Sequence, residues 1–236
     1  MKLKAVLFDL DGTLLPMDLN EFIGCYMHAL GARMQAHGYD PRALTRAIFK
    51  GTDAMLKNDG SKTNEAVFWD TFASIYGEAA RGDEKHFARF YEEDFDSVKQ
   101  VTAPTEKSAE VIRAVKGLGL RTVLATNPVF PRVATERRIS WAGLSREDFE
   151  LCTSYENSSY CKPNPLYYEE ILQKIGLCGE ECLMVGNDAV EDMAAEKAGM
   201  KVFLLTECLI THDRQDLDAY PQGGYEELLE YIRSLV

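Results

Sequence analysis

Two aspartates lie two residues apart at the end of an apolar run near the start of the chain. The stretch VLFDLDGTLLP (residues 6–16) contains Asp9 and Asp11, and Gly12 and Thr13 follow directly. Two unit charges about 4 Å apart repel by roughly 4 kcal/mol at an effective dielectric constant of about 20. The pair therefore needs a compensating positive charge, while Gly12 allows a sharp turn that Thr13 can hold by a local hydrogen bond.

Polar residues follow the later apolar runs as well. Thr126 and Asn127 come after one of them, Lys162 lies in a loop before a helical segment, and Asp188 and Asp192 follow another run. Each of these residues alone has an ordinary explanation, since threonines cap strands, lysines face solvent and acids favour helix N-termini. Their shared position is more specific, because the carboxyl ends of parallel strands meet at one edge of a sheet.

A metal ion would explain the acids at this edge. Asp9, Asp11 and Asp188 would converge there as hard oxygen ligands, which suit Mg²⁺. Mg²⁺ would offset the repulsion between the carboxylates, and Lys162 would add a further positive charge. The sequence therefore predicts Mg²⁺ as a cofactor.

The segments that must position these residues alternate between two types. Short runs of Val, Leu and Phe without strict polar alternation are typical of strands covered on both faces, and helical segments with glycine stops separate the later ones. This alternation predicts an α/β fold with a doubly wound parallel sheet. The predicted strands are Lys4–Phe8, Arg121–Ala125, Glu150–Thr153, Glu181–Val185 and Lys201–Leu205, and the predicted helices are Glu106–Lys116, Leu166–Ile175, Glu191–Ala198 and Tyr225–Val236.

A long helical insert interrupts the alternation after the first strand. From Met17 to Phe95 only helical periodicity is present, with Asp40 as a predicted N-cap and Pro41 in the first turn of the second of four helices. We therefore expect a core domain from residues 1–16 and 96–236 and an α-helical cap domain from residues 17–95. The cap would lie above the strand ends, where its basic residues contact an anionic substrate or face solvent; these are Arg33, Arg42, Arg46 and Lys50.

Composition limits the classes of partner. The chain has 236 residues and a net charge of −12, which argues against nucleic acid as a partner because no basic surface is available to displace counterions. No apolar run approaches the roughly 20 residues that a membrane-spanning helix needs, so we expect no membrane partner and a cytoplasmic protein. The six cysteines are expected to be reduced, and the four histidines lack paired spacing and are expected to have no catalytic role.

Four motifs resemble those of the haloacid dehalogenase (HAD) superfamily in the same order along the chain. They are Asp9-x-Asp11-Gly12-Thr13, Thr126-Asn127, Lys162-Pro163 and Gly186-Asn187-Asp188-x-x-x-Asp192. The resemblance implies a Rossmann-like core with a helical cap. It also implies a Mg²⁺-dependent phosphohydrolase that acts on a small phosphorylated metabolite.

The resemblance also implies a role for each matching residue. Asp9 would be the nucleophile that forms an aspartyl-phosphate, and Asp11 the general acid and base. Thr126, Asn127 and Lys162 would hold the phosphoryl group, with Lys162 also orienting Asp9. The family most often has an acid at the position of Asn187. Because this chain has asparagine there, the next residue, Asp188, is the expected metal ligand, together with Asp9 and Asp11. Gly12, Thr13, Asn187 and Asp192 would support the site.

Two other functions fit parts of this pattern. A sugar-phosphate mutase of the same family would use the same pair of acids after the first strand. A receiver-like binding module, switched by phosphorylation, would also combine acids, Mg²⁺, a threonine and a lysine on a parallel sheet. The insert and Asp11 weigh against the receiver, and Asp11 also disfavours dehalogenases, which would have a non-acidic residue there. The oligomeric state is not predicted.

Overall fold

The computed structural model describes residues 2–212 and 216–236 and contains a six-stranded parallel sheet. The strand order β3-β2-β1-β4-β5-β6 places β1 at the centre and confirms the predicted doubly wound, Rossmann-like α/β fold. The strands are β1 (Ala5–Phe8), β2 (Arg121–Leu124), β3 (Leu151–Cys152), β4 (Cys182–Gly186), β5 (Lys201–Leu205) and β6 (Gln222–Gly223). The short β6 was not predicted, because its two residues have no apolar pattern.

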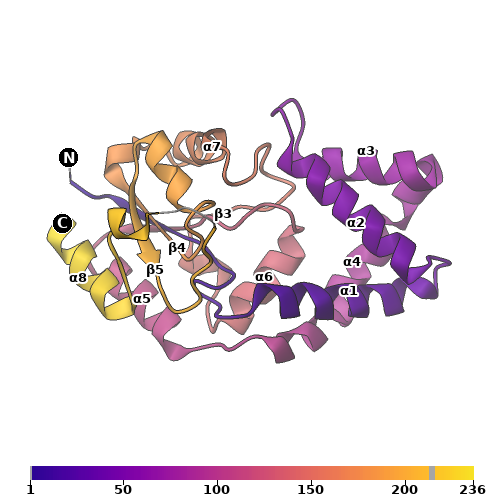
Figure 1. The fold of residues 1–236 in the computed structure, drawn as a ribbon, viewed down its shortest axis with the longest axis horizontal. Helices are drawn as coiled ribbons and strands as arrows, with labels where there is room; N and C mark the ends of the chain where they lie inside the picture. Colours follow the sequence, from indigo (N-terminus) through magenta and orange to yellow (C-terminus); the bar gives the residue numbers. More distant parts are fainter. Residues whose placement is uncertain (1, 213–215) are drawn as a thin grey trace.

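Both faces of the sheet are covered by helices (Figure 1). Along β1, Val6 and Phe8 belong to one apolar cluster, and Ala5 and Leu7 belong to a second cluster on the opposite face. The first cluster includes residues of α5 (Glu106–Gly117), α6 (Arg132–Trp141) and α8 (Tyr225–Leu235), and the second includes α7 (Pro165–Ile175). Burial on both faces explains why the strands lack polar alternation.

Two elements differ from the predictions. The predicted helix Glu191–Ala198 is the 3₁₀ helix η5 (Met193–Ala198), which begins later because the residues before it form a turn that directs Asp192 at Lys162. Helix α6 was not predicted. Its buried face includes Arg138, which is 0% exposed, and this charged residue interrupts the apolar periodicity that would mark a helix.

Residues 17–95 form the four predicted helices, which lie to one side of the sheet (Figure 1). The Asp40 side chain caps the second helix by accepting a hydrogen bond from the Ala43 N–H at 2.8 Å, as predicted. The helices are α1 (Leu19–Gln35), α2 (Pro41–Leu56), α3 (Asn64–Tyr76) and α4 (Glu84–Glu93), with the 3₁₀ helices η1 (Glu78–Asp83) and η2 (Phe95–Val101). The division into domains at residues 16/17 and 95/96 stays a prediction.

The first residue of α3 fixes the helical insert to a loop of the core. Asn64 is 0% exposed, and its side-chain amide donates hydrogen bonds to the Pro128 carbonyl at 3.2 Å and the Cys161 thiol at 3.3 Å. Its backbone N–H donates to the Ser158 carbonyl at 2.8 Å. Because Cys161 precedes Lys162, this contact connects the position of the insert to the loop that carries the predicted catalytic lysine.

The structure bears on two expectations, the lack of a membrane-spanning helix and the reduced cysteines. In residues 2–212 and 216–236, no helix is long and apolar enough to cross a membrane. All six cysteines are free thiols, as expected, and three of them, Cys152, Cys161 and Cys182, are buried. The cytoplasmic location stays a prediction.

Candidate active site

A buried lysine between two buried carboxylates forms the floor of the site. Lys162 Nζ lies 2.7 Å from Asp9 Oδ1 and 2.6 Å from Asp192 Oδ1, and these three residues are 2%, 7% and 1% exposed. Asp9 follows β1, and its N–H donates to the Val185 carbonyl of β4 at 2.9 Å, which fixes the backbone at the carboxyl edge of the sheet. The sequence prediction that Lys162 orients Asp9 matches this contact.

Burial and neighbouring charges shift the pKa values of Asp9 and Lys162 in opposite directions. Burial raises the pKa of Asp9 to about 7, against the lowering effect of Lys162. Burial lowers the pKa of Lys162, but Asp192 and Asp9 outweigh it, so that the pKa lies well above its ordinary value. Lys162 therefore stays protonated and holds the two acids close to each other.

Asp11 is paired with a second buried cation. One guanidinium nitrogen of Arg138, on α6, donates a hydrogen bond to Asp11 Oδ2, while Asp11 Oδ1 is buried and has no hydrogen-bond partner. The guanidinium carbon lies 4.4 Å from the centre of the Phe130 ring and 5.9 Å from that of Phe22. The two aspartates of the first motif are thus held apart by separate cations, Lys162 for Asp9 and Arg138 for Asp11.

The turn after Asp11 packs directly against the fourth motif. Gly12 has φ +87°, and a Cβ atom there would lie 2.3 Å from Asn187 Nδ2, so no side chain fits. Thr13 Oγ1 donates to Asn187 Oδ1 at 2.9 Å, and Asn187 Nδ2 donates to the Cys208 carbonyl at 2.6 Å. Asn187 therefore joins the first motif to the loop after β5, and the structure brings Gly12, Thr13 and Asn187 together.

The residues after β2 lie beside the same acids. Thr126 is 2% exposed, and its carbonyl accepts hydrogen bonds from Thr153 Oγ1 at 2.7 Å and the Tyr167 hydroxyl at 2.8 Å, which fix its backbone. Asn127 Nδ2 donates to Glu191 Oε2 at 3.1 Å, and its Oδ1 is buried without a hydrogen-bond partner. Burial raises the pKa of Glu191 to about 7. The unpaired Asn127 oxygen and the Glu191 carboxyl are polar groups available to a ligand.

Asp188 is held by backbone and side-chain donors. Its Oδ1 accepts hydrogen bonds from the N–H groups of Val190 at 2.7 Å and Glu191 at 2.8 Å, and His212 Nε2 lies 3.1 Å away. Its own N–H donates to Asp192 Oδ2 at 2.9 Å. These contacts fix the carboxylate of Asp188 at the rim of the site.

A cavity of about 190 Å³ collects the predicted residues at the carboxyl edge of the sheet. Its described lining includes five carboxylic acids but neither a lysine nor an arginine. Three of the predicted residues, Gly12, Thr13 and Lys162, are not among the lining residues. The lining residues with polar side chains are Asp9, Asp11, Thr126, Asn127, Asn187, Asp188, Glu191 and Asp192.

This donor set fits a hard cation. Carboxylate oxygens predominate, and the buried Asp11 Oδ1 lacks a partner. Among residues 2–212 and 216–236, however, no three side chains of His, Cys, Asp or Glu form a ready group of metal ligands. Asp9, Asp11 and Asp188 line one cavity, but each carboxylate is directed at its own protein partner, so the role of the three as metal ligands stays a prediction.

Sequence reasoning missed three residues of the site. Arg138 and Glu191 lacked any motif, and they could be found only through the buried partners, Asp11 and Asn127, that the fold gives them. His212 contacts Asp188, although the spacing of the histidines gave no sign of a role.

The four cap cations fit the solvent-facing alternative. Arg33 pairs with Glu93 and Asp94, and none of Arg33, Arg42, Arg46 and Lys50 lines the cavity.

Comparisons with known proteins agree with this geometry. The family model for haloacid dehalogenase-like hydrolases matches residues 3–199. The chain is 26% identical over 222 residues to pyrophosphatase PpaX of Bacillus cereus, covering 93% of this chain and 90% of the relative. A PpaX of Bacillus anthracis is 26% identical over 203 residues, covering 85% of this chain and 82% of the relative.

Solved structures share the fold at low sequence identity. A 2-haloacid dehalogenase from Pseudomonas syringae superposes with a TM-score of 0.65 at 18% identity, covering 99% of this chain and 100% of the other. A predicted phosphoglycolate phosphatase from Haemophilus somnus superposes with a TM-score of 0.57 at 18% identity, covering 98% of each chain. The motifs, the site geometry and the family match lead to one conclusion: this chain belongs to the haloacid dehalogenase-like hydrolases.

Proposed function

We propose that this hydrolase cleaves a phosphomonoester of a small molecule through an aspartyl-phosphate on Asp9, with Mg²⁺ as its cofactor. One observation carries the proposal: Asp9 lies at the floor of the acidic cavity with one oxygen held by Lys162, and Asp11, Thr126, Asn127 and Asp188 line the same cavity. A cavity lined by five acids needs a bound cation to accept a phosphate dianion, and Mg²⁺ would supply that charge through Asp9, Asp11 and Asp188.

The reaction takes two displacement steps at phosphorus. In the first, an Asp9 carboxylate oxygen attacks the phosphorus, the bond from phosphorus to the leaving oxygen breaks, and Asp11 donates a proton to that oxygen. In the second, water attacks the aspartyl-phosphate, Asp11 takes the proton from the water, and inorganic phosphate leaves as Asp9 is restored. Thr126, Asn127 and Lys162 would hold the phosphoryl oxygens in line throughout.

The contact of Asp11 with Arg138 adds a requirement to this scheme. Asp11 Oδ2 accepts a hydrogen bond from Arg138, so the carboxyl must turn toward the cavity to reach the leaving oxygen. Phosphate binding beside Asp9 would provide the new partner for that movement. The other predicted residues act indirectly: Asp192 holds Lys162, and Gly12, Thr13 and Asn187 fix the turn.

The names of the relatives suggest phosphate compounds as substrates. PpaX is named as a pyrophosphatase and the Haemophilus protein as a phosphoglycolate phosphatase. Both named substrates are small anions with a second charged group. Family membership favours an enzyme over a receiver-like binding module, and the identity of the product separates a phosphatase from a sugar-phosphate mutase.

Phosphate release tests the proposal directly. The purified protein with Mg²⁺ is expected to release inorganic phosphate from members of a panel of phosphorylated metabolites. EDTA is expected to stop release, and Mg²⁺ is expected to restore it. Asp9→Asn is expected to lower turnover on the order of 10³-fold or more, because the amide cannot act as the nucleophile.

Asp59→Asn is the matched control, since Asp59 is an exposed loop residue of the helical insert. It is expected to keep full activity. Undiminished phosphate release in Asp9→Asn would overturn the assignment of the nucleophile, and an isomerised sugar phosphate without free phosphate would establish the mutase.

A further inference from the structure

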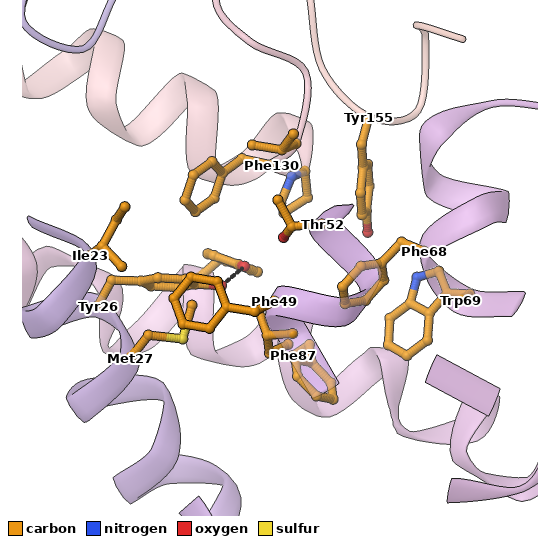
Figure 2. A pocket seen from close by; sticks show the side chains of 14 residues that line it. Ile23, Tyr26, Met27, Phe49, Thr52, Phe68, Trp69, Phe87, Phe130 and Tyr155 are labelled. Atoms are coloured by element: carbon orange, nitrogen blue, oxygen red, sulfur yellow. Dashed lines mark hydrogen bonds between the residues drawn. The ribbon is translucent and has the colours of Figure 1, made fainter. Parts of the chain in front are cut away.

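A second cavity adjoins the acidic one inside the helical insert. It has a volume of about 110 Å³ and lies between α1, α2, α3 and α4 of the insert and the core segment that contains Phe130 (Figure 2). Ile23, Val129 and Phe130 line both cavities, so that one wall separates the site of the reacting phosphate from the interior of the insert. A group attached to a phosphate at Asp9 would extend past these three side chains into this second cavity, the cap cavity.

The cap cavity is lined by neutral and largely aromatic side chains. Eight of its lining residues are Phe, Tyr or Trp, and none of the described lining residues carries a charge. Phe49, Phe68, Trp69 and Phe87 face the cavity from the insert in Figure 2. Aromatic faces are electronegative, and an anion placed among them loses its hydration. Arg138, whose guanidinium stacks on Phe130, is already paired with Asp11. The cap cavity is therefore unsuited to a carboxylate or a second phosphate.

Three polar groups in the wall of the cap cavity are neutral hydrogen-bonding groups. The indole N–H of Trp69 is buried and points toward the Tyr155 hydroxyl, with which it interacts (Figure 2). The Thr52 hydroxyl faces the same space from α2. By contrast, the Tyr26 and Tyr91 hydroxyls are 2.7 Å apart and bind each other. The Thr52 and Tyr155 hydroxyls therefore give the cavity neutral groups that can bind a polar atom of a ligand.

We propose that the cap cavity is the subsite for the leaving group, and that the substrate is a phosphomonoester whose alcohol carries a neutral, ring-sized apolar group. The proposal rests on the proposed phosphatase function and adds the class of alcohol. An apolar cavity of about 150 Å³ in another protein takes up benzene, so a cavity of comparable size suits a single ring. Small substrates with several negative charges, such as pyrophosphate or 2-phosphoglycolate, would leave the cap cavity unfilled or place a charge in it.

A matched set of alkyl phosphates tests the class of leaving group. Benzyl phosphate, ethyl phosphate and 2-phosphoglycolate all release an alcohol, so differences in kcat/KM report on the group beyond the oxygen. Burial of a ring of this size predicts a kcat/KM for benzyl phosphate about 10- to 100-fold above that for ethyl phosphate. The value for 2-phosphoglycolate is expected to be the lowest of the three. A value for 2-phosphoglycolate equal to or above that for benzyl phosphate would overturn the proposal.

A variant that fills the cavity localises the effect. Thr52→Phe places a ring in the cap cavity and is expected to lower kcat/KM for benzyl phosphate at least 10-fold, while ethyl phosphate changes little. Asp53→Phe adds the same side chain to the exposed neighbouring position of α2 and is expected to keep the preference of the unmodified protein. An unchanged preference in a folded Thr52→Phe protein would contradict the proposal. If that variant does not fold, the comparison of the three esters still decides.

Binding of the alcohol alone separates this proposal from the proposed function. Benzyl alcohol is expected to change the fluorescence of Trp69, and Trp69→Phe is expected to abolish that change. Binding without phosphate release from any ester would refute the phosphatase but support the subsite. Phosphate release with a preference for 2-phosphoglycolate, and no fluorescence change, would refute the subsite and support the phosphatase.

Discussion

The two cavities on either side of Ile23, Val129 and Phe130 have opposite chemistry. The cavity at the sheet edge is lined by five acids, whereas the described lining of the cap cavity contains no charged residue and is mostly aromatic. The difference teaches that reaction and selection are separated in the fold. In the proposed function, the charges that would act on phosphorus are positioned at the edge of the sheet, and the helices of the insert would select the leaving group by shape and apolar contact.

The acidic cavity depends on cations that are buried behind it. Lys162 and Arg138 are each almost fully buried, and each pairs with one aspartate of the first motif. Removal of a buried cation should therefore cost more stability than a change at a glycine or at an exposed pair.

Removal of Lys162 is expected to have the largest effect on stability. Lys162→Met leaves Asp9 and Asp192 buried beside each other without a cation, which should lower the free energy of unfolding by about 3–5 kcal/mol. Urea unfolding at neutral pH measures this. Lys57→Met is the matched control, because Lys57 forms an exposed pair with Asp53, and a loss of under about 0.5 kcal/mol is expected. Equal losses in the two variants would contradict the structural role of Lys162.

The close approach of Gly12 to Asn187 is expected to give the next largest effect. Gly12→Ala requires a side chain at φ +87° and places its Cβ 2.3 Å from Asn187 Nδ2, so a loss of about 2–3 kcal/mol is expected. Gly38→Ala has a similar φ of +86° with no atom within 4 Å, and should lose only about 1 kcal/mol. The difference between the melting temperatures of the two variants measures the packing of the first motif against the fourth. Equal melting temperatures would show that Asn187 moves aside freely.

Arg138 allows a test of shape at constant charge. Arg138→Lys keeps the positive charge near Asp11 but removes the planar group stacked on Phe130 at 4.4 Å. A loss of about 1–2 kcal/mol is expected, since lysine does not replace a stacked guanidinium. Arg137→Lys, at the partly exposed neighbouring position of α6, is expected to change stability by under about 0.5 kcal/mol. If Arg138→Lys leaves the free energy of unfolding unchanged, charge alone holds Asp11.

The site at the sheet edge could be predicted from the sequence because its residues occur in short, ordered patterns. Asp9 and Asp188 each follow an apolar run, and parallel strands bring such positions together whatever lies between them. Lys162 lies in the loop before a helical segment that follows a third run. Arg138 and Glu191 could not be predicted in the same way. They are recognised by their contacts with particular partners, Asp11 and Asn127. In α6, the buried charge of Arg138 also breaks the apolar pattern that would otherwise reveal the helix.

The cap cavity could not be predicted from the sequence, for a different reason. Its aromatic residues were interpreted as the core of a helical bundle, and most of them, such as Phe68 and Phe87, are indeed buried. An apolar residue that lines a cavity has the same periodicity as one that fills a core. Only the packing of α1 to α4 around Phe130 distinguishes the two, and that packing depends on contacts between distant residues.

The surface ion pair between Arg121 and Glu150, at the opposite end of β2, is expected to give the smallest effect on stability. The hydrogen bond from Arg121 lowers the pKa of Glu150, so the pair stabilises the fold above the unfolded pKa of Glu150, and the benefit is lost as pH falls through the folded value. The two side chains are 35% and 44% exposed, which limits the contribution to under about 1 kcal/mol. Glu150→Gln should therefore be slightly less stable than the unmodified protein at about pH 7 and equal to it at about pH 3, measured by urea unfolding. A stability difference that persists at the lower pH would show that packing of the Glu150 stem, rather than its charge, is responsible.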